Sequence, residues 1–356
     1  MKAMVLAAGK GTRMQPLTDN RAKLMLPIAN KPLFYHVIQS IINANIGEIL
    51  VIIGYQKEQI IDFFKKYKFP IQITLIEQKK QLGTAHAVSF AKKYVKNEPF
   101  FVMNGDVLAK TSDITQAIKT HQEKKPVATL TLVKVEDPTQ YGVVKIKDGW
   151  IEKIVEKPKV KKAPSNFANA GLYIFESEIF DAIEKTPKSA RGEFEITTSI
   201  QLLINWGKRV YGWFLKDYYI DISKPWDLLK ANQFVLGKIE SQNLGNIEER
   251  VTLKGPIQIG DGTIVRNGAY IQGPVVIGEH CDIGPNCYIR LHTSIGNNVR
   301  IGNGVEVKNS IIMDYTHIGH LSYVGDSIIG ENCNFGAGTK IANLRLDEKP
   351  VQVKIK

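Results

Sequence analysis

The segment from Leu6 to Met14 combines features that could hold a phosphate group. It follows a short apolar run, residues 3–6, which predicts a strand, and it places two glycines and two cations between Gly9 and Arg13. A Gly-rich turn lets backbone N–H groups come close to a phosphate, and the cations add positive charge. Taken alone, the segment is weak evidence, because a tight connection after a strand is the alternative.

Two carboxylates follow strand-like runs farther along the chain. Asp106 comes after the apolar run 100–103, and Asp221 comes after Tyr218, Tyr219 and Ile220. Ligands of open α/β sheets bind at the carboxyl ends of the strands. An aspartate at a strand end is alternatively a turn residue or a helix cap.

Strand and helix patterns alternate up to about residue 240. The nearly continuous apolar runs 49–53 and 100–103 are typical of strands buried on both faces, and residues 32–44 and 58–67 have helical patterns. This alternation predicts an α/β sheet. The strand-rich stretch 127–147 makes a mixed sheet the expectation. Residues 227–240 predict a helix that leads to a polar joint near residues 237–249.

A period of six residues begins beyond about residue 250. The apolar positions that fall six apart are Ile259, Val265, Ile271, Ile277, Ile283, Ile289, Ile295, Ile301, Val307 and Met313. The register then slips by one residue to Ile318, and again between Val324 and Ile329. Three hexads make one triangular coil of a parallel β-helix, in which each apolar residue points inward and stacks on its equivalent in the next coil.

Length, charge and cysteine spacing limit the classes of function that fit this sequence. A chain of 356 residues predicts about two domains, and its net charge of +12 comes from scattered Lys and Arg residues, not from a basic tail or stripe. An anionic small substrate therefore explains the charge better than nucleic acid. No apolar run approaches the roughly 20 residues of a membrane span, and the first strand begins almost at Met1, so we expect a cytoplasmic protein with no membrane partner. The three cysteines lack zinc-site spacing.

The first motif, together with several others in order, closely resembles the signature of sugar-1-phosphate nucleotidylyltransferases that carry a C-terminal hexapeptide β-helix. The matching segments are 6–14, 16–18, 23–33, 78 with 81–85, 104–106, 141–144, 156–158, 169–171 and Asp221. The resemblance covers the whole chain. It implies a Rossmann-like mixed α/β nucleotidyltransferase domain at residues 1–240 and a left-handed parallel β-helix at residues 250–356, which commonly assembles as a trimer.

The resemblance also assigns roles in nucleotidyl transfer. A sugar-1-phosphate oxygen attacks the α-phosphorus of a nucleoside triphosphate, and pyrophosphate leaves. The expected triphosphate contacts are Ala8, Gly9, Gly11 and Thr12, with Arg13 on the leaving group. Lys23 contacts the α-phosphate and the attacking phosphate, although Ala22 stands where members usually have proline. Asp106 and Asp221 are expected to hold Mg²⁺.

The residues expected to recognise the base and the sugar match two different subfamilies. Gln78, Gly83 and Thr84 match residues that read the base in the uridylyltransferases, whereas the Glu156-Lys157-Pro158 segment is closer to the thymidylyltransferases. Gly142, Glu156 and Asn169 are expected to bind the sugar, and Lys157 its phosphate. The favoured reaction joins UTP and N-acetylglucosamine-1-phosphate. The alternatives are a glucose-1-phosphate thymidylyltransferase that uses dTTP, and a regulatory or assembly subunit without catalysis.

A second motif in the β-helix resembles the acetyltransferase part of bifunctional members. Residues 319–326 and 332–339 carry the match, with His320 as the expected general base that deprotonates the amine. The expected contacts to the acceptor are Arg290, Lys308, Tyr323, Asn334 and Lys349. The sequence ends at Lys356, where relatives continue with coils that bind acetyl-CoA. We therefore expect the acetyltransferase site to be incomplete.

Overall fold

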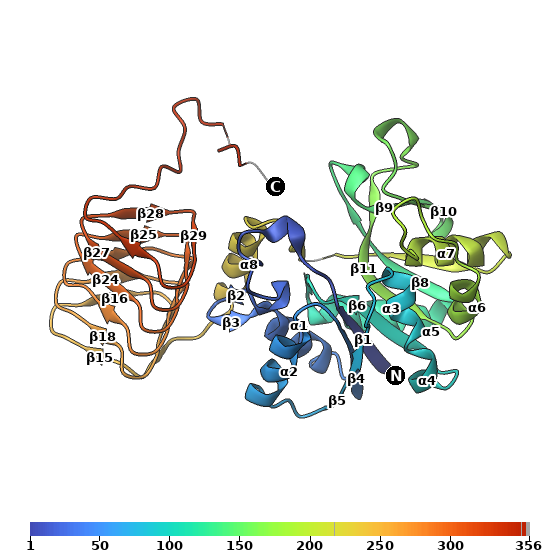
Figure 1. The fold of residues 1–356 in the computed structure, drawn as a ribbon, viewed down its shortest axis with the longest axis horizontal. Coiled ribbons are helices and arrows are strands. Elements are labelled where there is room, and N and C mark those ends of the chain that lie inside the picture. The colour runs from blue at the N-terminus through green and yellow to red at the C-terminus, as the bar shows by residue number, and fades with distance from the viewer. Residues whose placement is uncertain (217, 350, 354–356) are drawn as a thin grey trace. The chain divides into compact units, whose positions relative to one another are not determined.

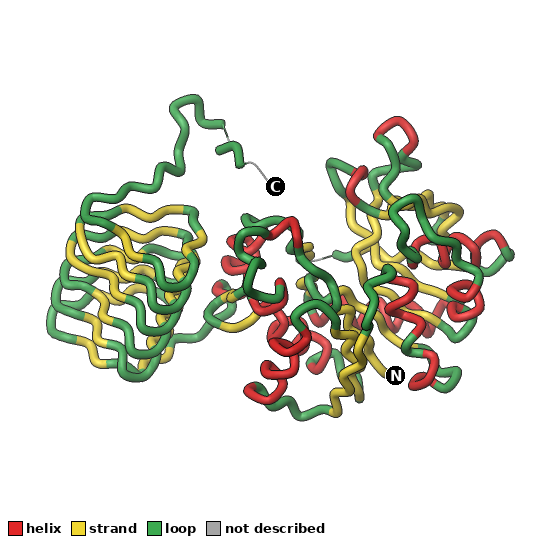
Figure 2. Tube along the Cα trace, viewed as in Figure 1, coloured by secondary structure: helices red, strands yellow, loops and turns green. Residues whose placement is uncertain are grey.

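The computed structural model describes residues 1–216, 218–349 and 351–353. They divide into two compact units. The first unit consists of residues 1–10, 21–25 and 34–221, and the second of residues 11–20, 26–33 and the described residues from 222 onward. Figure 1 shows the elements of each unit, and Figure 2 their division into helices, strands and loops.

The first unit is built on a mixed sheet that confirms the predicted α/β class. Its nine strands, counted over the described residues, run in the order β5-β4-β1-β6-β11-β8-β12-β10-β9. Strands β5, β4, β1 and β6 are mutually parallel, whereas β11 is antiparallel to β6 and β8. The bounds are β1 Lys2–Ala7, β4 Glu48–Ile53, β5 Gln72–Glu77, β6 Phe100–Asn104, β8 Ala128–Lys134, β9 Gly142–Lys147, β10 Trp150–Glu156, β11 Phe167–Phe175 and β12 Val210–Phe214.

Helices bury both faces of this sheet. Met4, Leu50 and Val102 share one apolar cluster with residues of α3 (Thr84–Ser89), α4 (Lys92–Val95), α6 (Ile179–Glu184) and α7 (Ile196–Asn205). Alternate strand residues point to the opposite face, where His121 of α5 (Thr111–Lys124) contacts Thr129 of β8. Helices α1 (Leu33–Ile42) and α2 (Lys57–Lys66) pack through Phe34 and Phe63, whose ring centroids are 5.4 Å apart.

The second unit contains the coils of a parallel β-helix, in which three sheets of short strands stack coil upon coil (Figure 1). Strands β17 (Ile257–Ile259), β20 (Val275–Ile277) and β23 (Thr293–Ile295) belong to one sheet, and Ile259 pairs with Ile277, which pairs with Ile295. This step of 18 residues confirms three hexads per coil.

The remaining strands of the unit follow the same scheme. They are β14 Gln242–Asn243, β15 Asn246–Ile247, β16 Thr252–Lys254, β18 Ile264–Val265, β19 Tyr270–Gln272, β21 Asp282–Ile283, β22 Tyr288–Ile289, β24 Arg300–Asn303, β25 Glu306–Lys308, β26 Ile311–Ile312, β27 His317–His320, β28 Tyr323–Gly325, β29 Ile328–Ile329 and β30 Asn334–Phe335.

One position of the predicted hexad repeat is wrong. Ile312, not Met313, pairs with Ile295 and belongs to the apolar core of the β-helix. The corner after Val307 is one residue shorter than the corner after Ile289, so the register slips one hexad earlier than the sequence pattern indicates. Met313 is buried as well, and a pattern of buried apolar residues could not separate it from Ile312.

Helix α8 (Asp227–Leu236) and the hairpin of β2 (Pro27–Ile28) and β3 (Lys31–Pro32) also belong to the second unit. Leu236, Ala29 and Val276 form a small apolar cluster between α8, the hairpin turn and the β-helix. Two further short strands, β7 (Val107–Ala109) and β13 (Tyr219–Asp221), pair in the first unit. Within the described part of the chain, no helix is both long and apolar enough to cross a membrane.

Candidate functional site

Four chain segments meet at the carboxyl edge of the parallel strands in the first unit. The backbone N–H of Gly105 donates to Leu6 O at 2.9 Å, and the N–H of Gln78 donates to Ile53 O at 2.8 Å. Tyr55 N–H donates to Ala8 O at 3.3 Å. These bonds bring together the turns that follow β1, β4, β5 and β6. Ligands of open α/β sheets bind at this edge.

Lys23 and Asp106 form an ion pair there, between Nζ and Oδ2. Lys23 lies on a 3-10 turn, Lys23–Met25, and is only 9% exposed. The preceding residue is anchored to α2, because Ala22 N–H donates to Gln59 Oε1 at 2.8 Å. A buried ammonium group is costly without an acidic partner, so the pair holds Lys23 in place.

Asp106 and Asp221 lie on neighbouring chain segments. Strands β7 and β13 are antiparallel, and Asp221 pairs with Val107, the residue after Asp106. Burial raises the pKa of Tyr219 well above its ordinary value, and the charges of Asp221 and Asp106 raise it further. Both carboxylates therefore act on the same phenol. Among the described residues, no three His, Cys, Asp or Glu side chains group as metal ligands, so any metal here would need oxygen atoms from substrate or water.

A second cluster of predicted residues lies on β9, β10 and β11. A Cβ atom on Gly142 would lie 3.2 Å from Glu156 Oε2 and 3.7 Å from Asn169 Cβ. Thr197 Oγ1 donates to Glu156 Oε2 at 3.0 Å, and Arg191 donates to Glu156 Oε1 at 3.2 Å. The structure thus brings Gly142, Glu156 and Asn169 together, as expected of a shared ligand site.

Burial shapes the chemistry of this cluster. It raises the pKa of Glu156, and the nearby Glu195 carboxylate raises it further, while Thr197, Lys157 and Arg191 oppose the shift. Asn169 Nδ2 donates to Tyr173 Oη at 2.6 Å, which orients the Asn169 amide. Lys157 is exposed just after β10, and its backbone N–H donates to Tyr141 O at 2.9 Å.

Gln78, Gly83 and Thr84 form a third predicted group. Gln78 is 3% exposed, and its Nε2 donates to Gly83 O at 3.4 Å and faces His86 Nδ1 at 2.8 Å. Gly83 has a φ of +108°, and a Cβ atom there would lie 2.5 Å from Phe194 O. No residue with a side chain fits that position without displacing backbone. Thr84 Oγ1 accepts a bond from Ile196 N–H at 3.0 Å.

The glycine-rich segment continues into the second unit. Gly11 has a φ of +66° and precedes a 3-10 turn, Thr12–Met14, in which Thr12 and Arg13 are exposed. Met14 is fully buried and anchors the turn. Gly11 O accepts from Met14 N–H at 2.9 Å and from Thr18 Oγ1 at 3.0 Å. Gly9, on the other side of the unit boundary, has open space where a Cβ atom would lie.

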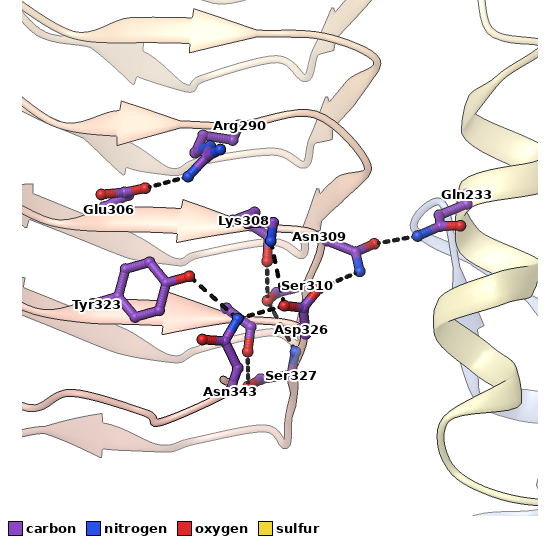
Figure 3. Close-up of polar contacts among 11 residues, drawn as sticks. Gln233, Arg290, Glu306, Lys308, Asn309, Ser310, Tyr323, Asp326, Ser327 and Asn343 are labelled. Carbon is purple, nitrogen blue, oxygen red and sulfur yellow. Dashed lines mark hydrogen bonds and ion pairs between the residues drawn. The ribbon is translucent and has the colours of Figure 1, made fainter. Parts of the chain in front are cut away.

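The residues predicted to bind an acetyl acceptor are mostly engaged with neighbours in the β-helix (Figure 3). Arg290 is paired with Glu306 at 2.8 Å, and Lys308 with Asp326 at 3.5 Å. Tyr323 Oη accepts from Asn343 Nδ2 at 3.2 Å.

The other predicted acceptor residues are exposed. His320 lies on β27, Asn334 on β30, and Lys349 close to the end of the described chain. The backbone N–H of Lys349 donates to Asp347 Oδ1 at 3.3 Å.

Comparison with known proteins identifies the family. The nucleotidyl transferase profile matches residues 2–238, and the profile of the GMPPB C-terminal domain matches residues 271–356. A bifunctional protein GlmU from Methanococcus maripaludis is 44% identical over all of this chain and 84% of its own length. The chain belongs to the sugar-1-phosphate nucleotidylyltransferase/acetyltransferase family.

Two further relatives agree with this membership. A bifunctional sugar-1-phosphate nucleotidylyltransferase/acetyltransferase from Sulfurisphaera tokodaii is 40% identical over all of this chain and 86% of its own. Among solved structures, a UDP-glucose pyrophosphorylase complexed with UDP-glucose is 26% identical, with a TM-score of 0.61 over 67% of this chain and 98% of its own. The sequence-based prediction of the family is confirmed.

The family motifs did not identify three residues whose side chains contact predicted site residues of this nucleotidyltransferase. Arg191 and Thr197 hold the Glu156 carboxylate, and His86 faces the Gln78 amide. Arg191 and Thr197 lie 35 and 41 residues from Glu156, without a motif of their own. His86 directly follows the 81–85 segment and could have been found by its helical spacing from Gly83.

Proposed function

We propose that this sugar-1-phosphate nucleotidyltransferase transfers uridylyl groups from UTP to N-acetylglucosamine-1-phosphate and releases pyrophosphate. The observation that carries the proposal is the buried Lys23–Asp106 ion pair beside Asp221, at the carboxyl edge of the parallel strands. The proposed reaction needs no protein nucleophile, because a phosphate oxygen of the sugar attacks the α-phosphorus directly. Positioning and charge stabilisation supply the rate enhancement.

Each predicted residue has a role in this proposal. Lys23 contacts the α-phosphate and the attacking phosphate, and Arg13 stabilises the leaving pyrophosphate. Ala8, Gly9, Gly11 and Thr12 present backbone groups to the triphosphate. Asp106 and Asp221 hold Mg²⁺, which when bound supplies positive charge to the phosphate oxygens. Two carboxylates on neighbouring chain segments, completed by oxygen atoms of substrate and water, fit that ion.

Recognition of base and sugar is assigned to the two other groups. Gln78, Gly83 and Thr84 contact the base, while Gly142, Glu156 and Asn169 bind sugar hydroxyl or N-acetyl groups. Lys157 binds the sugar phosphate. A carboxylate that accepts two bonds from protein donors, as Glu156 does, is oriented for hydroxyl donors of a sugar. The segment Glu156-Lys157-Pro158 also favours a second candidate, thymidylyl transfer from dTTP to glucose-1-phosphate.

A pyrophosphate-release assay tests these assignments. UTP and dTTP are each combined with N-acetylglucosamine-1-phosphate and glucose-1-phosphate, and the pair with the highest kcat/KM identifies the reaction. We expect UTP with N-acetylglucosamine-1-phosphate to be preferred. Asp106→Asn and Asp221→Asn should each lower kcat at least about 100-fold. Asp62→Asn, an exposed aspartate paired with Lys65, is the matched control.

Three results would contradict the proposal or a part of it. A preference for dTTP and glucose-1-phosphate would support the thymidylyltransferase. Absence of turnover with every pair would support a regulatory or assembly subunit. An Asp106→Asn variant as active as the wild type would remove Asp106 from the proposed reaction.

Acetyl transfer at the β-helix motif is proposed to be weak or absent. Of the three cations expected to bind the acceptor phosphate, Arg290, Lys308 and Lys349, the first two already face the carboxylates of Glu306 and Asp326 (Figure 3). An incoming phosphate would have to replace these partners. The test is acetyl-CoA-dependent loss of the free amine of glucosamine-1-phosphate. Steady turnover that His320→Ala abolishes would overturn this part of the proposal.

The remaining assignments concern the whole protein. We propose residues 1–240 as the nucleotidyltransferase domain and residues 250–356 as a left-handed β-helix, with trimer formation through the β-helix and a cytoplasmic location. The stacked apolar core supports the β-helix. Light scattering coupled to size exclusion measures the oligomeric mass, and an experimental structure gives the hand of the coils.

A further inference from the structure

The orientation of the Gln78 amide is determined by two neighbouring residues. Nε2 lies 3.4 Å from Gly83 O and 2.8 Å from His86 Nδ1. A carbonyl oxygen can only accept, so the amide atom that faces it is the NH₂ group. The same NH₂ group faces His86, whose Nδ1 must therefore accept. This requires the neutral imidazole tautomer with its proton on Nε2.

The surroundings of His86 hold it in place and favour a neutral ring. Its ring packs edge-on against Phe90, with 5.2 Å between the ring centroids. Ser89 Oγ donates to His86 O at 2.7 Å within the same turn of α3. Burial lowers the pKa of His86, which favours the neutral ring at physiological pH.

The main chain of Gln78 is held as firmly as its amide. Its N–H donates to Ile53 O at 2.8 Å, and its carbonyl oxygen accepts from Gln81 Nε2 at 3.1 Å. Both hydrogens of the side-chain NH₂ group are directed to protein acceptors. Of the residues that the structure describes, none donates to Gln78 Oε1. The amide therefore offers an incoming group an acceptor and no donor.

We infer that His86 is a positioning residue for base selection, which keeps Gln78 Oε1 facing the nucleobase. The inference rests on the proposed function, in which Gln78 contacts the base. Uracil and thymine carry a donor, N3–H, where cytosine carries the acceptor N3. A fixed acceptor thus selects UTP or dTTP over CTP and does not separate UTP from dTTP. A rotated amide would present NH₂ and accept cytosine.

Variants of His86 test this role through the ratio of kcat/KM for UTP to that for CTP, with N-acetylglucosamine-1-phosphate as acceptor. His86→Phe keeps an aromatic ring but removes the acceptor, and we expect the ratio to fall about tenfold or more. His86→Asn can place its Oδ1 near the lost Nδ1, so it should retain most of the discrimination. His317→Phe, at an exposed position of β27, is the matched control and should leave the ratio unchanged.

Either of two kinetic outcomes overturns the inference. A His86→Phe ratio equal to that of the wild type shows that Gln78 needs no support from the imidazole. A His86→Asn ratio as low as that of His86→Phe shows that restoring an acceptor near Nδ1 does not restore the discrimination, which contradicts a role through hydrogen-bond acceptance. Nitrogen-15 NMR of the imidazole gives a direct check, because a ring protonated on Nδ1 contradicts the geometry.

Nucleotide binding without sugar phosphate separates this inference from the proposed reaction. Calorimetry measures the Kd of UTP and of CTP for the wild type and for His86→Phe. A UTP preference that His86→Phe loses supports the inference even if no sugar phosphate turns over. Wild-type protein that binds UTP and CTP equally, or neither, overturns it.

Discussion

Asn232 of α8 and Ala29 of the β2–β3 turn are 203 residues apart in the chain and are joined by a buried hydrogen bond. Asn232 Oδ1 accepts the N–H of Ala29 at 2.8 Å and Ser294 Oγ at 2.6 Å, and Nδ2 donates to His292 O at 3.0 Å. Ala29 has a φ of +47°, a conformation that non-glycine residues adopt at a cost. The fully buried Asn232 amide therefore holds a strained turn against the β-helix.

Asn232→Leu should destabilise the second unit by about 2–4 kcal/mol, because it leaves buried donors and an acceptor without partners. The measurement is urea-induced unfolding followed by circular dichroism. Asn205→Leu, an exposed residue of α7 that accepts from Gln201, is the control and should change the free energy of unfolding by less than about 0.5 kcal/mol. Equal losses in the free energy of unfolding of the two variants would show that the buried Asn232 amide stabilises the protein no more than the exposed Asn205 amide does.

If Lys23 has the proposed role on the phosphates, Lys23→Met should lower kcat for nucleotidyl transfer by about 100-fold or more, because the charge that faces Asp106 is lost. Methionine keeps the length of the buried stem, so the protein should remain folded. The control is Lys65→Met, which removes an exposed lysine paired with Asp62. A kcat within about threefold of the wild-type value would remove Lys23 from the reaction.

The KM for the sugar-1-phosphate should rise as the pH falls through the raised pKa of Glu156. Burial and Glu195 shift this pKa upward, so the carboxylate protonates at a higher pH than an exposed glutamate and loses its capacity to accept from sugar hydroxyls. Glu156→Gln should remove this pH dependence and raise KM throughout. Steady-state kinetics between about pH 4.5 and 8 measures the effect.

The same shift has a consequence for stability. Because the pKa of Glu156 is higher in the folded protein than in the unfolded chain, its stabilising contribution is present below the unfolded value and is lost as the pH rises through the folded value. Glu156→Gln should therefore be at least as stable as the wild type at pH 7. Glu152→Gln, on the same strand with a pKa lowered by Lys145, is the control. A Glu156→Gln protein less stable than the wild type at pH 7 would contradict the raised pKa of Glu156.

His121 should contribute stability above its unfolded pKa of about 6.5 that is lost as the pH falls. Burial lowers its folded pKa against the opposing pull of Glu176, so the folded protein binds fewer protons there than the unfolded chain. The His121→Gln variant should show a weaker fall in Tm between about pH 7 and 5 than the wild type. An exposed histidine variant, His317→Gln, should follow the wild-type curve, and a His121→Gln curve that does the same would disprove the role.

Sequence patterns predicted the elements of this protein well. Buried strands of α/β sheets are nearly all apolar, so β1, β4 and β6 were found close to their observed bounds. The hexad period predicted coils of 18 residues because every third inward position in the chain stacks on its predecessor. It failed at Ile312, because Ile312 and Met313 are both buried and a pattern of apolar residues does not show that the corner after Val307 is one residue shorter.

By itself, the sequence determined the fold class and the family, because apolar periodicity and short motifs are local properties of the chain. Only the tertiary structure decided which side chains act on each other. Lys23 meets Asp106 across 83 residues, and Thr197 reaches Glu156 across 41. Such contacts arise from sheet order and burial, which bring distant segments within hydrogen-bonding range and exclude the water that would otherwise satisfy their polar groups.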